Sequence, residues 1–184
     1  GIRRLDPQEY RMNPYYRQIR IPEAHFGNWK LTIEKYKPYE AFVCDDIRTD
    51  EELKEIPQIG FFDTEFSFPA VMEDGQEWMA IKPNEIETMR QPIARAAGQV
   101  VAFGLGMGYY AFMVSEKPEV KTLTIVERDE NVIAFLNFLK RRRSISFGKM
   151  LLSLRRIACP TAITTMLLWI YGTMYPTDIL FTSK

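Results

Sequence analysis

Residues 99–108 read QVVAFGLGMG, and this stretch decides the fold class. Residues 99–103 form the kind of apolar strand that lies in a parallel sheet buried on both faces. Three glycines follow within residues 104–108, and residues 109–116 have the pattern of a short helix. Glycine lets the backbone turn sharply and lets a ligand approach closely, while the start of a helix offers unpaired N–H groups. The stretch therefore predicts a strand, a ligand-binding turn and a helix.

A second strand and helix follow the first pair. Residues 123–126 are an apolar strand that ends at Glu127, and residues 131–139 place their apolar side chains on one helical face. This order of elements is typical of an α/β domain with a parallel sheet. Glu127 lies 19 residues after Gly108. A separation of about 20 residues is expected between a nucleoside-binding glycine loop and the acid that accepts hydrogen bonds from ribose hydroxyls.

The sequence before this unit predicts a small β-rich N-terminal region over residues 1–82. Residues 29–34 alternate apolar and polar side chains, which predicts a half-buried strand, and residues 39–43 are its expected partner. Asp-Gly at positions 74–75 lies between two apolar runs and predicts a hairpin. We expect a helix to begin after this hairpin, with Asn84 as its N-cap.

The spacing of the glycines separates two classes of ligand. A dinucleotide-binding loop has the pattern G-x-G-x-x-G, and its third glycine falls where this chain has Tyr109. This chain has G-x-G-x-G instead. A pyrophosphate needs the closer helix packing of the dinucleotide pattern, whereas S-adenosylmethionine has no phosphate.

Residues 101–109, VAFGLGMGY, resemble motif I of the class I S-adenosylmethionine-dependent methyltransferases. Residues 124–128, TIVER, resemble the acidic motif at the end of the second strand of that family. The hairpin and helix expected over residues 77–97 resemble the approach to the first strand in its spermidine-synthase-like branch. The resemblance spans about residues 66–140. It implies a Rossmann-like parallel sheet, with residues 83–140 as the S-adenosylmethionine-binding unit.

The resemblance also implies the site. S-adenosylmethionine would be the cofactor, with its methionine part along the glycine turn, its ribose hydroxyls bonded to Glu127 and its adenine near Arg128. The cofactor-binding residues implied in this way are Gly104, Leu105, Gly106, Gly108, Glu127 and Arg128. The activity would be transfer of the sulfonium methyl group to an acceptor that the sequence does not identify. No catalytic residue and no metal ligand is assigned.

Three other functions stay open at this point. A spermidine-synthase-like aminopropyl transferase would use the same loop for the decarboxylated cofactor, but the acids it needs downstream are absent from residues 141–184. The chain could also be a non-enzymatic S-adenosylmethionine-binding or interaction module. A dinucleotide oxidoreductase ranks last because of Tyr109.

Charge and composition limit the expected partners. The 24 basic and 24 acidic side chains give a formal net charge of zero, which argues against a nucleic-acid partner. The most apolar stretch, residues 158–181, is interrupted by two prolines and an aspartate, so we expect no membrane span. Two distant cysteines, Cys44 and Cys159, predict reduced thiols in a cytoplasmic protein. The oligomeric state is not indicated.

Several other polar or aromatic groups have ordinary structural interpretations. His25 is the only histidine, and its aromatic neighbours indicate packing rather than catalysis. The acidic pairs Asp45-Asp46 and Asp63/Glu65 could bind a metal or a polyamine, but are expected to be solvated loop charges. Five tyrosines within residues 10–39 either form a substrate lid or pack as core.

Residues 141–184 differ in character from the rest of the chain. Residues 1–138 hold 16 basic and 23 acidic side chains, net −7, whereas residues 139–184 hold 8 basic and 1 acidic, net +7. The third and fourth strands of a class I methyltransferase, with their Asp-Ala and Asp motifs, are not visible in this segment. Codons compatible with residues 146–152, read one base out of register, can encode IREDAF, and those for residues 164–178 can encode YDAxVDIWDDVSDG. We therefore hypothesise a frameshifted, truncated methyltransferase.

The coding DNA tests this hypothesis. Codons 141–184, read one base out of register, should spell both motifs, because a slip within the purine-rich codons possible for residues 140–143 displaces every codon after it. If sequencing of this DNA finds neither motif, the segment is a divergent C-terminus or a basic tail that serves a partner or a membrane surface.

Overall fold

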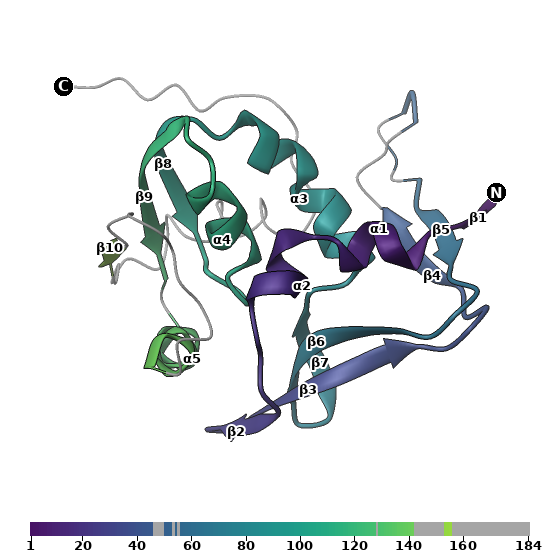
Figure 1. Cartoon of the computed structure of the whole chain (residues 1–184), viewed down its shortest axis with the longest axis horizontal. Helices are drawn as coiled ribbons and strands as arrows, with labels where there is room; N and C mark the ends of the chain where they lie inside the picture. The colour runs from purple at the N-terminus through teal and green to yellow at the C-terminus, as the bar shows by residue number, and fades with distance from the viewer. Residues whose placement is uncertain (46–49, 53, 55, 128, 142–152, 156–184) are drawn as a thin grey trace.

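The computed structural model describes residues 1–45, 50–52, 54, 56–127, 129–141 and 153–155 (Figure 1). Within these residues the chain is a mixed α/β protein in which a β-rich N-terminal region precedes a parallel sheet. The N-terminal region contains β1 (Ile2–Arg4), α1 (Pro7–Arg11), α2 (Pro14–Gln18), β2 (Ala24–Phe26), β3 (Trp29–Tyr36), β4 (Phe42–Asp45), β5 (Gln58–Phe61), β6 (Phe66–Glu73) and β7 (Gln76–Ala80). The elements that follow are α3 (Pro83–Arg95), β8 (Gly98–Phe103), α4 (Tyr109–Ser115), β9 (Val120–Val126), α5 (Glu130–Arg141) and β10 (Ser153–Arg155).

The larger N-terminal sheet is antiparallel, with the strand order β2-β3-β6-β7. The predicted half-buried strand is confirmed as β3, in which Trp29 and Leu31 are buried and Lys30 is exposed. The predicted alternation ends there, since Thr32 is buried and Ile33 is exposed. The predicted hairpin is also confirmed, because β6 and β7 are joined at Asp74 and Gly75. These two residues have φ of 51° and 78°. Positive φ at both central positions is what a type I′ turn requires.

The smaller N-terminal sheet has the order β1-β5-β4, with β1 parallel and β4 antiparallel to β5. The expected pairing of residues 39–43 with residues 29–34 is therefore wrong. The two edges of β3 are taken by β2 and by β6, so β4 pairs with β5 instead. Gly60 of β5 permits this packing, since a Cβ there would lie 2.7 Å from Leu5 Cδ1 and 3.1 Å from Cys44 Sγ.

The third sheet is parallel throughout, with the order β10-β9-β8. The predicted strand–helix–strand–helix order is confirmed as β8, α4, β9 and α5. The expected burial of the first strand on both faces is wrong, since no residue of β8 is fully buried and Val101 is exposed. Helix α4 contacts β9, and α3 contacts both α4 and β4, so these two helices lie between the parallel sheet and the N-terminal region (Figure 1). Residues 141–184 do contribute one short strand, because β10 pairs with β9, but this strand does not carry the Asp-Ala motif of the family. Three residues are too few to give a periodic signal. The other residues of 142–184 lie outside the described part of the chain.

Helix α3 starts differently from the prediction. Asn84 is not its N-cap, because Lys82 holds that position and Pro83 is the first helical residue. Proline suits this position, since it has no N–H to leave unpaired and its φ is already helical. Glu85 does lie in the first turn, where an acid is favoured by the helix dipole.

The N-terminal region and the parallel sheet share one cluster of buried apolar side chains. Tyr15 of α2 lies at the joint and is 1% exposed. Its ring makes edge contacts with Tyr109 at 5.5 Å and with Phe112 at 6.0 Å, both in α4. Its hydroxyl donates a hydrogen bond to the Met107 carbonyl oxygen at 2.7 Å. Tyr15 therefore fastens α2 to the turn between β8 and α4.

We expect Tyr15→Phe to lower the free energy of unfolding by about 1–3 kcal/mol, because it leaves the buried Met107 carbonyl unpaired. Urea denaturation followed by circular dichroism measures this. Tyr39→Phe is the matched control, because Tyr39 is 71% exposed, and it should change stability by less than about 0.5 kcal/mol. Equal stability of the Tyr15→Phe and Tyr39→Phe proteins would contradict the role given to Tyr15.

Candidate functional site

The turn between β8 and α4 is built from glycines with left-handed backbone. Gly104, Gly106 and Gly108 have φ of 78°, 53° and 80°. Residues with a Cβ rarely adopt this region, so glycine is needed at these positions. The Gly108 N–H donates to the Leu105 carbonyl at 2.9 Å, which closes the turn. The Gly104 N–H donates to the Val126 carbonyl at 2.8 Å, which ties the turn to the end of β9.

Glu127 follows β9 directly and is 5% exposed. Its Oε2 accepts a hydrogen bond from the Leu105 N–H at 2.7 Å, and its Oε1 accepts one from the Asp129 N–H at 2.8 Å. Hydrogen bonds to an ionised acceptor are short and strong, and they are stronger away from water. The two bonds orient the carboxylate between the glycine turn and the start of α5. The acid and the turn thus meet although Leu105 and Glu127 are 22 residues apart in sequence.

The antiparallel N-terminal sheet approaches the glycine turn and the start of α5 at two points. A Cβ added to Gly106 would lie 3.8 Å from the Met79 Sδ of β7. A Cβ added to Gly27, in the turn between β2 and β3, would lie 3.4 Å from the Asn131 Oδ1 near the start of α5. The antiparallel sheet therefore approaches the carboxyl end of the parallel strands. In open α/β sheets this is the end at which ligands bind.

Tyr109 occupies the position at which a dinucleotide-binding loop has its third glycine. Its side chain is buried, and its hydroxyl accepts a hydrogen bond from the Asn13 Nδ2 at 3.0 Å. Burial raises the pKa of Tyr109 and of its neighbour Tyr15 above the ordinary tyrosine value. Both hydroxyls therefore stay protonated at neutral pH, and their hydrogen bonds connect the N-terminal region to α4 and to the turn.

The structure brings most of the predicted cofactor residues together. The residues that meet at the turn and the end of β9 are Gly104, Leu105, Gly106, Gly108 and Glu127. Arg128 lies outside the described residues. Sequence reasoning missed the Asp129 amide, although an N–H two residues after an acid is a common local partner for its carboxylate. It also missed Met79, which carries no sequence signal because its position depends on how two sheets pack together.

The other candidates lie elsewhere. His25 is exposed on β2, so its interpretation as a packed residue is wrong. Asp63 and Glu65 form ion pairs with basic residues of β1 and β3. Asp46 lies outside the described residues. Among the described residues, no three side chains of the metal-binding types come together.

Comparison of the sequence with protein-family models and with curated proteins finds no match. In the described part of the chain, no helix is long and apolar enough to cross a membrane. The chemistry of the site itself therefore carries the functional assignment.

Proposed function

We propose that this chain is an S-adenosylmethionine-dependent methyltransferase built on a Rossmann-like unit. The observation that carries the proposal is the hydrogen bond between the Leu105 amide and the Glu127 carboxylate. It joins a glycine turn and an acid at the carboxyl ends of two adjacent parallel strands, where an acid typically accepts hydrogen bonds from ribose. The strand order β10-β9-β8 supports it too, since the doubly wound nucleotide-binding sheet begins with the order 3-2-1.

The residues present fit an adenosyl group. Glu127 lies at the turn with its carboxylate oriented by the Leu105 and Asp129 amides, at the position where an acid is expected to meet ribose hydroxyls. The glycines of the turn present backbone rather than side chains, which lets the methionine part of the cofactor approach closely. Among the residues that the structure describes, a Cβ added to Gly106 would meet only the Met79 sulfur within 4 Å, so the turn is open on this side. Arg128 beside the adenine stays a prediction.

S-adenosylmethionine, held by the glycine turn and Glu127, would supply an activated sulfonium methyl group for transfer to a nucleophile. The residues of this chain would contribute by holding the acceptor in line with the methyl carbon. Proximity and orientation alone can account for a large part of such a rate enhancement. We assign no general base.

The buried ring of Tyr109 favours this function over a dinucleotide oxidoreductase. The third glycine of the dinucleotide pattern allows close packing of helix and strand. Here a tyrosine ring at that position packs against Tyr15 at 5.5 Å. The start of α4 therefore packs against the N-terminal region through the Tyr109 ring, and the dinucleotide pattern has glycine instead of a side chain at this position.

Isothermal titration calorimetry tests the proposal. The wild-type chain should bind S-adenosylmethionine and S-adenosylhomocysteine, and Glu127→Ala should weaken both by roughly 10–100-fold, because charge-assisted hydrogen bonds to the ribose are lost. Circular dichroism spectra and melting temperatures establish that the variant is folded.

Glu119→Ala is the matched control. Glu119 is exposed and precedes β9, at the opposite end of the strand from Glu127, so its loss should leave both affinities unchanged. Full affinity in folded Glu127→Ala would refute the ribose assignment. Absence of binding to the wild-type chain would refute the function.

A further inference from the structure

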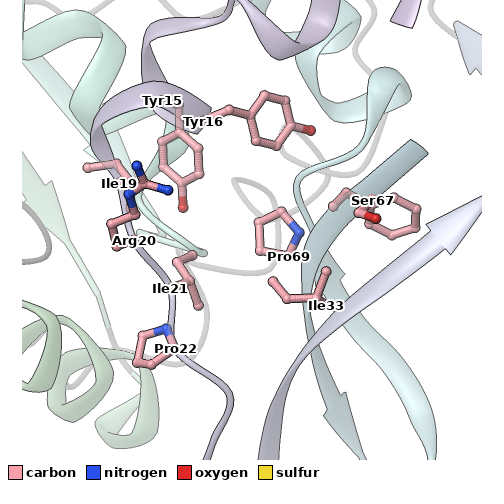
Figure 2. A pocket seen from close by; sticks show the side chains of 10 residues that line it. Tyr15, Tyr16, Ile19, Arg20, Ile21, Pro22, Ile33, Ser67 and Pro69 are labelled. Atoms are coloured by element: carbon pink, nitrogen blue, oxygen red, sulfur yellow. The ribbon is translucent and has the colours of Figure 1, made fainter. Parts of the chain in front are cut away.

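A cavity of about 520 Å³ lies between α2, the segment that follows it and the antiparallel sheet (Figure 2). Residues 15–22 supply one wall, and Ile33 of β3 with residues 67–69 of β6 supplies the other. Figure 2 shows these two groups of side chains facing each other across the hollow. The volume is within the range of about 300–1,000 Å³ that is usual for small-molecule sites.

This cavity and the glycine turn share a wall. Tyr15 lines the cavity, and its hydroxyl donates to the carbonyl of Met107 within the turn at 2.7 Å. Tyr16 lines it as well, and its hydroxyl donates to the Ile81 carbonyl, just after β7. Strand β7, which ends just before Ile81, also carries Met79, and the Met79 sulfur lies beside Gly106. A molecule in the cavity that contacts Tyr15 would therefore lie one side chain away from the Met107 backbone of the turn.

The chemistry of the lining is apolar with a single positive charge. Both tyrosine hydroxyls are already bonded to carbonyls, which leaves the Arg20 guanidinium and the Ser67 hydroxyl as polar groups for a ligand. Arg20 forms no ion pair with any residue that the structure describes. The described residues that line the cavity include no acid.

We propose that this cavity binds the methyl acceptor, and that the acceptor is an apolar or aromatic molecule carrying a carboxylate or phosphate group. This rests on the proposed function. A guanidinium binds either anion through two parallel hydrogen bonds, and Ile21, Pro22 and Ile33 offer an apolar surface for the body of the molecule. A polyamine would meet Arg20 with no acid to balance its charge. The cavity therefore favours methyl transfer over aminopropyl transfer.

The binding class can be tested without the cofactor. We would titrate 2-naphthoate, 1-naphthyl phosphate, neutral 2-naphthamide and spermidine into the full chain and measure affinity by calorimetry. At least one anion should bind at least about tenfold more tightly than 2-naphthamide, and spermidine should not bind. The stronger of the two anions identifies carboxylate or phosphate as the preferred group.

Arg20→Gln should abolish the preference for the anions, and Ile33→Glu should weaken both by placing a like charge in the apolar wall. Arg17→Gln is the matched control, because Arg17 is exposed on α2 and does not line the cavity. The proposal would be overturned if 2-naphthamide bound as tightly as the anions, if spermidine bound more tightly than they do, or if neither anion bound. Unchanged anion binding by Arg20→Gln would also overturn it. The affinity for S-adenosylmethionine should be the same in Arg20→Gln and in the wild-type chain. This measurement distinguishes a failure of the proposed cofactor site from a failure of the proposed acceptor cavity.

Discussion

The hydrogen bond from the Leu105 N–H to the Glu127 carboxylate joins the ends of two parallel strands at one point. The amide reaches the acid only because the turn around it runs through left-handed glycines, which bend the backbone where a side chain would strain it. The same carboxylate accepts from the Asp129 amide and so fixes the start of α5. The proposed cofactor site depends on this arrangement, since any shift of the turn would displace the acid and the backbone that faces the ligand.

The N-terminal region is part of the same arrangement rather than an attachment to it. Tyr15 bonds to the turn through its hydroxyl, and its ring packs on α4. Arg20, which is exposed and follows α2 in the same segment, lines the adjoining cavity. One short segment thus braces the turn and supplies the only charge in the cavity wall among the described residues. In the proposed reaction a single packed unit would hold donor and acceptor, which is how a transferase gains from proximity and orientation.

The sequence predicted those features whose signal is local. Asp74-Gly75 specifies its turn through two positive φ angles, and the apolar run before Gly104 specifies a parallel strand. The expected burial of that strand on both faces is wrong, because Val101 is 57% exposed. The pairing of β4 could not be predicted, because it depends on β2 and β6 occupying both edges of β3. Met79 beside Gly106 and the cavity next to Tyr15 likewise arise from the packing of distant segments, which leaves no periodic trace in the sequence. His25 was wrongly expected to pack because its neighbours in sequence are aromatic, yet it lies exposed on an edge strand.

The central claim is that the Glu127 carboxylate, held by the glycine turn, receives the ribose of an adenosyl ligand. A crystal structure of the chain with S-adenosylhomocysteine tests this most directly. Both ribose hydroxyls should lie within about 3 Å of the Glu127 oxygens, a normal hydrogen-bond distance, and the homocysteine tail should lie along Gly104 to Gly108. A ligand bound elsewhere, or one whose ribose makes no contact with Glu127, would contradict it.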